Sequence, residues 1–312
     1  MNRKVILDCD PGVDDCIALM AALGAPDAID LLGVSVVAGN VPVEICARNA
    51  ASVLTLAGRC DVKVHAGCAR PMVFEPVFAD HIHGETGLGA ARLPEPEAPV
   101  QARHAVDFLC DMLERAEPGS ITLVLTGPMT NAALALVKAP GIAEAIAEIV
   151  VMGGAREAGG NITASAEFNI FADPHAAHVV LNAGLKTTLI GLDATLQLRC
   201  TPQRLARLKA SSHRAPQAAA AMVEHVNGVY GEIYGDEGAA LHDPCTIGYL
   251  LAPHLFAARP AAVHVDTRDG LTRGHTAVDI HLLSGAPANV SWVTGLDAPA
   301  LFDLLLEHME RV

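Results

Sequence analysis

The residues best suited to chemistry in this chain form an acidic turn near the N-terminus. Four carboxylates fall within eight residues: Asp8, Asp10, Asp14 and Asp15. An apolar run at residues 5–7 precedes them, a Pro-Gly pair interrupts them, and a helix-forming run at residues 16–23 follows. Carboxylates this close repel one another unless a cation joins them. Because carboxylate oxygens suit Ca²⁺ or Mg²⁺, the turn predicts a hard-cation site rather than a solvated acidic turn.

Other side chains occupy comparable places further along the chain. Asn40, Thr126 and Asp193 each follow an apolar run that is typical of a buried strand, and Met152 closes another such run. If these strands are parallel, their carboxyl ends meet at one edge of a sheet, beside Asp10. Each residue alone is weak evidence, so the prediction of a site depends on their convergence.

Strand and helix patterns alternate through the first two thirds of the chain. Strands are predicted at residues 5–7, 31–37, 62–65, 121–125, 149–152 and 187–190. Helices are predicted at residues 16–23, 43–56, 102–115 and 174–182, and another follows the strand at 121–125 and reaches about Lys138. Between them, residues 67–101 show neither period and predict a long loop of the kind that carries function.

The last third predicts helices at 202–208, 215–230, 244–251 and 298–309, a strand at 290–293, and a hairpin of residues 263–266 and 276–280. Alternating strands and helices favour a parallel sheet covered on both faces. The predicted fold class is therefore α/β and Rossmann-like, with a mostly parallel central sheet and a small C-terminal β-hairpin. No linker or repeat divides the chain, so residues 1–312 are predicted to form one domain.

Composition excludes several classes of partner. Hydrophobic residues make up 51% and charged residues 18%, which provides for a large core. A net charge of -14 argues against nucleic acid and anionic membranes as partners. The eight cysteines form no C-x-x-C pair, which disfavours a zinc site and suits reduced thiols in a cytoplasmic protein. No signal peptide or bilayer-spanning apolar run is visible.

The acidic turn belongs to a series of motifs that resembles the nucleoside hydrolase family of the inosine-uridine preferring type. The series runs in order through nearly the whole chain, at residues 8–15, 37–40, 83–89, 126–128, 151–154, 166–174 and 242–245. The run from Ala79 to Gly87 is most similar to the pyrimidine-preferring branch. A single acidic loop would be a loose match, whereas this ordered series is specific.

The resemblance implies a Ca²⁺ cofactor and a ribonucleoside substrate. It implies that Asp10, Asp15, Asp243 and the backbone carbonyl of Thr126 hold the ion, and that Asp10 also acts as the general base on a water. The remaining implied contacts are with ribose: Asp14 and Asn40 with the 2′- and 3′-hydroxyls, Asn161, Glu167 and Asn169 with the 3′- and 5′-hydroxyls, and Met152 with the ring.

The implied reaction hydrolyses the N-glycosidic bond and releases ribose and a free base. Positive charge builds on the sugar, which a carboxylate-rich site favours. The departing base needs a proton or hydrogen bonds, and His242 and His83 are the candidates. His242 has the alternative role of a helix-cap neighbour, and His83 that of an uncommitted loop histidine. His81 and His83 have the spacing of a zinc pair, but no cysteine or acid partner is apparent.

Base preference stays open because this chain departs from the pyrimidine-preferring pattern on the nucleobase side. His81 replaces an Asn of the similar proteins, and Tyr230 replaces a Gln one helical turn before the aromatic Tyr234. Tyr230 and Tyr234 are candidates for contact with the base, or for an ordinary half-buried pair. Purine hydrolysis therefore remains an alternative to pyrimidine hydrolysis. The resemblance also implies a homotetramer or a dimer.

Two other classes of protein fit parts of the pattern. Asp8-x-Asp10 after a strand resembles the start of haloacid dehalogenase-type phosphatases, which use Mg²⁺, but that reading leaves Glu167 and Asp243 without a role. A non-catalytic nucleoside or ribose binder would retain the cation without hydrolysis. The other interpretations are structural: Asp8 bonds to nearby backbone, Asp193 is either a support of the cation site or a turn acid, and Phe168 and Met152 pack in the core.

Overall fold

The computed structural model describes residues 2–234 and 238–312, and the side chains of 230 and 232–234 lie outside that description. Its strands are β1 (Arg3–Cys9), β2 (Ile29–Val36), β3 (Val64–Ala66), β4 (Ile121–Leu125), β5 (Ile146–Met152), β6 (Thr187–Ile190), β7 (Phe256–Val265), β8 (Thr276–Asp279) and β9 (Val290–Leu296). They form a nine-stranded sheet in the order β3-β2-β1-β4-β5-β6-β9-β7-β8.

The order of the strands determines where a ligand can bind. Strands β1 to β6 are parallel to one another, β9 is parallel to β6, and β7 and β8 add an antiparallel edge next to β9. From β1 the chain first builds outwards through β2 and β3, then returns to the other side of β1 to place β4, β5 and β6. The order therefore reverses between β1 and β4, and open α/β sheets bind ligands at the carboxyl end of such a switch point.

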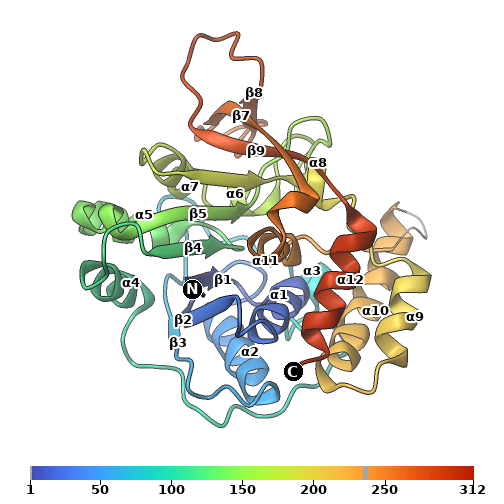
Figure 1. Cartoon of the computed structure of the whole chain (residues 1–312). Helices are drawn as coiled ribbons and strands as arrows, with labels where there is room; N and C mark the ends of the chain where they lie inside the picture. The colour runs from blue at the N-terminus through green and yellow to red at the C-terminus, as the bar shows by residue number, and fades with distance from the viewer. Residues whose placement is uncertain (1, 235–237) are drawn as a thin grey trace.

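Helices cover both faces of the sheet, as the predicted fold class requires (Figure 1). The helices are α1 (Val13–Leu23), α2 (Val43–Leu56), α3 (Asp80–His83), α4 (Ala105–Glu114), α5 (Thr130–Lys138), α6 (Phe168–Ala172), α7 (Pro174–Leu181), α8 (Leu192–Thr195), α9 (Pro202–Ala210), α10 (Arg214–Tyr234), α11 (Pro244–Leu251) and α12 (Ala298–Met309), with 3₁₀ turns at Pro140–Ala145 and Pro253–Leu255.

The alternation of side chains along β1 separates two hydrophobic cores. Val5 and Leu7 belong to the core beneath α1, α2, α10, α11 and α12, whereas Ile6 belongs to the core beneath α4, α5 and α7. Because successive strand residues point to opposite faces, a fully apolar run is needed where both faces are covered. Asp8, Asp10 and Asp15, which follow or end this run, are buried too. They therefore lie in a low-dielectric setting, where charge is costly.

Two local predictions need correction, and one short helix was not predicted. Helix α1 begins at Val13 and not at Cys16, so Asp14 and Asp15 lie in its first turn. The cause is the Asp15 carboxylate, which accepts the backbone N–H of Gly12 at 3.1 Å and so stabilises an earlier start. The loop at 67–101 contains the short helix α3, and the segment before Asp173 contains the short helix α6. Both are too short to show a helical period.

The C-terminal hairpin is present and longer than predicted. Strand β7 begins at Phe256 because it pairs first with β9 and only then with β8, through residues 262–265. Strand β9 joins this edge to the parallel strand β6. Figure 1 shows the β7–β8 hairpin extending the sheet on the side away from α2. In the described part of the chain, no helix combines the length and the apolar character needed to cross a bilayer.

Candidate active site

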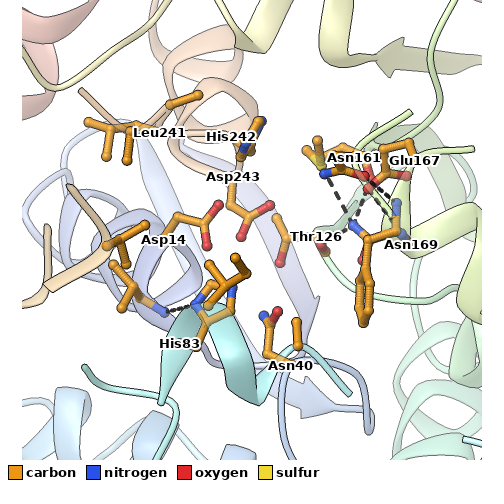
Figure 2. A pocket seen from close by; sticks show the side chains of 18 of the residues that line it. Asp14, Asn40, His83, Thr126, Asn161, Glu167, Asn169, Leu241, His242 and Asp243 are labelled. Carbon is orange, nitrogen blue, oxygen red and sulfur yellow. Dashed lines mark hydrogen bonds between the residues drawn. The ribbon is translucent and has the colours of Figure 1, made fainter. Parts of the chain in front are cut away.

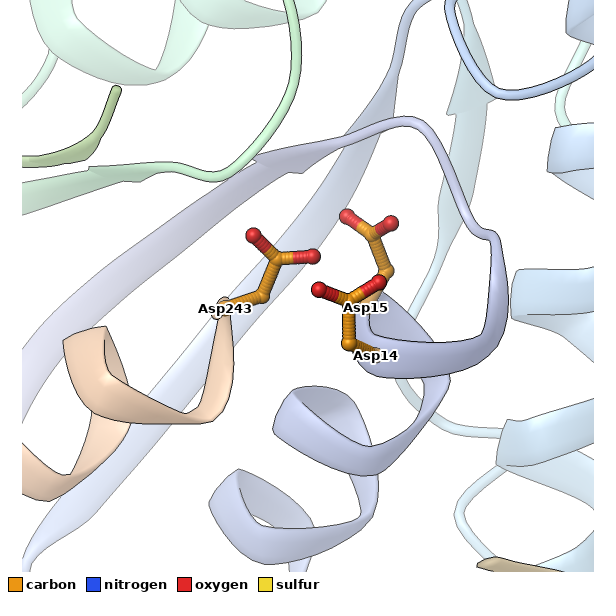
Figure 3. Close-up of side chains that lie close together, drawn as sticks. All are labelled: Asp14, Asp15 and Asp243. Carbon is orange, nitrogen blue, oxygen red and sulfur yellow. The ribbon is translucent and has the colours of Figure 1, made fainter. Parts of the chain in front are cut away.

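Acidic side chains from three segments meet at the switch point of the sheet. Asp10 follows β1, Asp14 and Asp15 come from the first turn of α1, and Asp243 directly precedes α11. Oxygens of Asp14, Asp15 and Asp243 lie within 4.8 Å of one another, as Figure 3 shows. We call these three residues the carboxylate cluster. Asp15 and Asp243 are more than 220 residues apart in the chain, so only the fold brings them together.

Asp15 is the most tightly held member of the cluster. Its Oδ1 accepts the Thr126 hydroxyl at 2.8 Å, and its Oδ2 accepts the Asn40 amide at 3.0 Å in addition to the N–H of Gly12. Burial raises the pKa of Asp15 to about 6, and the charge of Asp14 acts in the same direction. The hydrogen bonds oppose this shift and fix the orientation of the carboxylate.

Asp10 is enclosed by two glycine turns. Its Oδ2 accepts the backbone N–H of Asn40 at 2.8 Å. A side chain on Gly39 would meet Oδ2 at 2.0 Å, and one on Gly127 would meet Oδ1 at 2.6 Å. The glycines of the motifs at 37–40 and 126–128 thus allow the backbone to approach this carboxylate. Burial, and then the charge of Asp15, raises the pKa of Asp10 well above its usual range.

The donor set fits a hard divalent cation. Asp10 Oδ1 is buried and has no hydrogen-bond partner within the described chain. Burial also raises the pKa of Asp243, with the charges of Asp14 and Asp15 adding to the effect. A cation would satisfy the unpartnered oxygen and remove the repulsion among these carboxylates, and an all-oxygen set suits Ca²⁺ or Mg²⁺.

The arrangement differs in detail from the ligand set that the sequence implied. Asp14, expected at the ribose diol, lies in the carboxylate cluster, while Asp10 contacts the cluster through its backbone N–H, 3.3 Å from Asp15 Oδ1. The Thr126 carbonyl, expected to face the ion, accepts the Asn169 amide at 2.6 Å. A carbonyl oxygen has two lone pairs, so this hydrogen bond leaves one for another partner.

A pocket opens next to the carboxylate cluster, with a volume of about 850 Å³ including its solvent-open part. One wall, which we call the amide side, consists of Asn161, Glu167 and Asn169. Figure 2 shows these three residues gathered across from Asp14, His83 and Leu241. Met152, also in the pocket wall, closes β5 and is almost fully buried. Asp14 and Asp243 of the carboxylate cluster also line the pocket, so a ligand bound there would lie against the cluster.

Hydrogen bonds orient each polar group on the amide side. Asn161 Oδ1 accepts the N–H of Phe168 at 2.9 Å, which leaves its amide NH₂ for the pocket. Asn169 donates hydrogen bonds from its amide NH₂ to the carbonyls of Thr126 and Met152, which leaves its Oδ1 to accept from a ligand. Glu167 caps α6 by accepting the N–H groups of Asn169 and Ile170, and burial raises its pKa to about 7. The wall therefore presents both donors and acceptors at fixed positions.

The opposite wall, which we call the histidine side, mixes imidazoles with hydrocarbon. It consists of His81, Ile82, His83, Val223, Val226, Leu241 and His242. These residues come from α3, α10 and the segment before α11. Tyr230 and Tyr234, predicted for this side, lie outside the residues whose side chains are described. His81 is exposed in the rim of the pocket, whereas His242 is buried.

The two inner histidines are both held at Nδ1. His83 Nδ1 accepts the backbone N–H of Val13 at 3.0 Å, so this nitrogen carries no proton. His242 Nδ1 lies 2.7 Å from the Thr195 hydroxyl, and its Nε2 is buried without a partner in the described chain. Burial lowers the pKa of both rings. Both imidazoles are thus favoured in the neutral form.

The structure also places Asp193 and Asp8, for which the sequence suggested roles in supporting the fold. Asp193 accepts the N–H groups of Arg156 and Glu157 at 2.8 and 2.7 Å, so it is a turn acid and does not reach the carboxylate cluster. Asp8 bonds to the side chains of Ser35 and Asn131, and not to nearby backbone as predicted. These two partners are 27 and 123 residues away in sequence, so their contact with Asp8 is not visible without the fold.

Thr195, Val223, Val226 and Leu241 are pocket or pocket-supporting residues that sequence reasoning missed. Thr195 ends α8, and Val223 and Val226 lie on α10. A spacing of three residues on a helix places two valines on one face, which is a usable signal for a buried stripe but not for a pocket. No pattern in the sequence points to the hydroxyl of Thr195, because its contact with His242 spans 47 residues.

The fold and the pocket together define an α/β enzyme class with a carboxylate-rich, cation-compatible site at the switch point of its sheet. The family model described as inosine-uridine preferring nucleoside hydrolase matches residues 5–303. The chain therefore belongs to the inosine-uridine preferring nucleoside hydrolase family and is an enzyme.

Individual relatives match over nearly the full length. The chain is 42% identical over 309 residues to an uncharacterized protein of Schizosaccharomyces pombe, covering 99% of each. It is 41% identical over 311 residues to the pyrimidine-specific ribonucleoside hydrolase RihA of Shewanella woodyi, again covering 99% of each. Among solved structures, a purine-preferring ribonucleoside hydrolase from Gardnerella vaginalis aligns with a TM-score of 0.91 at 34% identity, covering 99% of this chain and 98% of the other. A plant nucleoside hydrolase aligns with a TM-score of 0.93 at 30% identity, covering 99% of each.

Proposed function

We propose that this enzyme hydrolyses the N-glycosidic bond of ribonucleosides in a Ca²⁺-dependent reaction, with pyrimidine ribonucleosides as preferred substrates. The observation that carries the proposal is the position of the carboxylate cluster between a wall of fixed amides and a wall of histidines. A ribonucleoside has two parts that match the two walls: a sugar rich in hydroxyls and a flat base with hydrogen-bond acceptors.

We assign the ion to Asp10, Asp15, Asp243 and the Thr126 carbonyl, with Asp14 beside them. When bound, Ca²⁺ would supply Lewis acidity toward a water and toward the sugar hydroxyls. The Asp10 carboxylate would also accept the proton of the attacking water. Its enclosure by Gly39 and Gly127 holds it in one place.

Ribose would lie against the amide side. The Asn161 amide would donate to a sugar hydroxyl, and the Oδ1 atoms of Asn169 and Asn40 would accept from others, because the hydrogen bonds of these side chains leave those atoms free for a ligand. Glu167 would accept a hydrogen bond from a hydroxyl while it holds α6 in place. Met152 would pack on the sugar ring.

The base would lie against the histidine side. Departure of the base moves negative charge onto it, and His83 and His242 would donate hydrogen bonds from Nε2 to offset that charge. Ile82, Val226 and Leu241 would exclude water from its face. Pyrimidine preference is supported by the similarity to RihA over the whole chain. Purine preference is the second candidate, because the Gardnerella vaginalis enzyme of that preference shares the fold closely.

We further propose that the chain forms one domain and assembles with copies of itself. The continuous sheet supports the first part. Leu271 and Leu283, which are 97% and 86% exposed in the loops after β7 and β8, are suited to burial against another copy. Sedimentation of the protein with and without substitution of both leucines by Ser tests the second part: a monomer in both samples would contradict it.

The experiment for the main proposal is a measurement of free base after incubation with uridine, cytidine, inosine, adenosine and their 2′-deoxy forms. We expect release of uracil and cytosine that exceeds release of purines, and weak release from the deoxy forms, which lack one of the hydroxyls. A phosphate monoester incubated with Mg²⁺ serves as the control. Turnover of the ester without any base release would favour a phosphatase, and unchanged nucleosides in every sample would favour a non-catalytic binder.

A further inference from the structure

Thr195 lies behind His242 and is fully buried. It is the last residue of α8, the short helix that follows β6, with Gly191 as the N-cap residue. The chain therefore brings the threonine to the carboxyl edge of the sheet, where its Oγ1 lies 2.7 Å from His242 Nδ1. This contact is the only hydrogen bond that the hydroxyl makes within the described part of the chain.

The direction of this hydrogen bond can be deduced from the donors available. A threonine hydroxyl has one proton to donate, and a buried donor without an acceptor loses free energy. If His242 carried a proton on Nδ1, the ring would donate to Oγ1 and the hydroxyl proton would have no acceptor. If Nδ1 is bare, the hydroxyl donates to it and is satisfied. The second arrangement places the ring proton on Nε2.

This direction gives Nε2 the ring proton and therefore the need for an acceptor. The atom is buried and has no partner within the described chain, and His242 is part of the pocket wall. A buried Nε2–H without a partner is unfavourable unless a ligand supplies an acceptor. A nucleobase provides such acceptors in its carbonyl oxygens and ring nitrogens. The unsatisfied proton thus becomes a feature of the unliganded enzyme that binding of the base corrects.

His83 provides an independent parallel. Its Nδ1 accepts the N–H of Val13, a donor whose direction is unambiguous because a backbone amide cannot accept. The proton of neutral His83 is therefore on Nε2 as well. Figure 2 shows this hydrogen bond, with His83 and His242 on either side of Asp14. Two donors from different parts of the chain, one backbone amide and one hydroxyl, select the same tautomer in two pocket histidines.

We propose that Thr195 is a positioning residue that selects the Nε2–H tautomer of His242, so that His242 donates a hydrogen bond to the departing base. The proposal rests on the proposed nucleoside hydrolysis and adds a residue to it. Thr195 touches neither sugar nor base. It acts through His242, whose Nε2–H is aligned before the glycosidic bond breaks, so that the negative charge that develops on the base meets a donor already in place.

The test compares Thr195→Val, which keeps the shape and removes the hydroxyl, with Thr195→Ser, which keeps the hydroxyl. Each variant is assayed for kcat with uridine, with inosine and with p-nitrophenyl riboside, whose leaving group needs no proton. We expect Thr195→Val to lose at least about tenfold in kcat on the nucleosides, a part of the ~10²–10⁴-fold that a general acid contributes. We expect less than about threefold loss on the nitrophenyl riboside, and near wild-type rates for Thr195→Ser.

Thr188→Val is the matched control, because it removes another buried threonine hydroxyl, which donates to Glu148 on β5 and does not contact His242. It should lower thermal stability without separating the substrates. Equal losses of Thr195→Val on nucleosides and nitrophenyl riboside, or equal losses of Thr195→Val and Thr195→Ser, would overturn the inference. A wild-type protein that releases no base would overturn the proposed function and this inference together, so the two failures are distinguishable.

A second measurement does not depend on the folding of a variant. The ¹⁵N NMR spectrum of histidine-labelled wild-type protein, with the His242 signals assigned by their absence in His242→Gln, reports which ring nitrogen is protonated. We expect an unprotonated Nδ1 and a protonated Nε2 in the unliganded protein. A protonated Nδ1 would overturn the inference whatever the kinetics show.

Discussion

On the amide side of the pocket, hydrogen bonds to the protein hold each polar group, whereas the histidine side takes apolar residues from helix α10. Asn161, Glu167 and Asn169 each have a protein partner that sets their orientation. Val223 and Val226 only fill space on the other wall. Under the proposed function, the groups that meet the cation and the sugar are held in place by the protein, whereas the base meets elements that can vary without disturbing those groups.

Removal of the cation tests the half of the site that is proposed to hold the cation and the sugar, and it has the largest expected effect. We expect a chelator to abolish base release and Ca²⁺ to restore it. We also expect loss of thermal stability, since an ion at a hundredfold excess over its Kd stabilises a protein by about 2.7 kcal/mol. Because Asp15 has a pKa raised to about 6, protons compete with the ion, and its affinity should fall as the pH is lowered through 6. Full activity in chelator would contradict the assignment.

Asp10→Asn tests the proposed base within the same half. We expect kcat to fall by about 10²–10⁴, because the amide cannot accept the proton of a water, while binding of ribose changes little. Asp8→Asn is the matched control: Asp8 is equally buried, but its bonded oxygen accepts from Ser35 and Asn131, which an amide oxygen can also do. Near wild-type kcat for Asp10→Asn would exclude Asp10 as the base.

His242→Ala moves the test to the histidine side. We expect a loss in kcat of about 10² on uridine and little loss on p-nitrophenyl riboside, because only the nucleoside needs help with its leaving group. Rates with both substrates, measured side by side, decide the matter. Should both fall by the same factor, His242 supports the structure of the site and does not assist departure of the base.

Val226→Ala is expected to have the smallest effect and to leave the amide side untouched. Loss of two methyl groups from the wall should lower kcat/KM for nucleosides by about tenfold, in the range known for hydrophobic pockets. Inhibition by free ribose should be unchanged, since ribose does not reach α10 in this account. A parallel loss of ribose inhibition would show that the two walls are not independent.

The sequence predicted the carboxyl edge of the sheet around Asp15 better than the histidine side, for a physical reason. Asn40 and Thr126 follow apolar runs, and parallel strands deliver such residues to one edge, so their meeting with Asp15 could be inferred without coordinates. The enclosure of Asp10 by Gly39 and Gly127 could not be inferred from the sequence, because it depends on how two turns approach each other.

The histidine side was less predictable because its elements leave a weaker trace. Helix α3, which carries His83, is a four-residue helix within a long loop, where no periodicity develops. The bonds that set the tautomers join Val13 to His83 and Thr195 to His242, across 70 and 47 residues. A single sequence contains the residues of such pairs but no information about their pairing.

The most direct test of the central claim is a calorimetric titration of ribose into the protein, once with Ca²⁺ present and once after chelation. If the carboxylate cluster and the amide side hold one cation and one sugar together, ribose will bind in the first titration and fail to bind in the second, and Asp15→Asn with Ca²⁺ will behave like the chelated protein. Equal ribose affinity in all three titrations would contradict the claim that the ion and the sugar share this site.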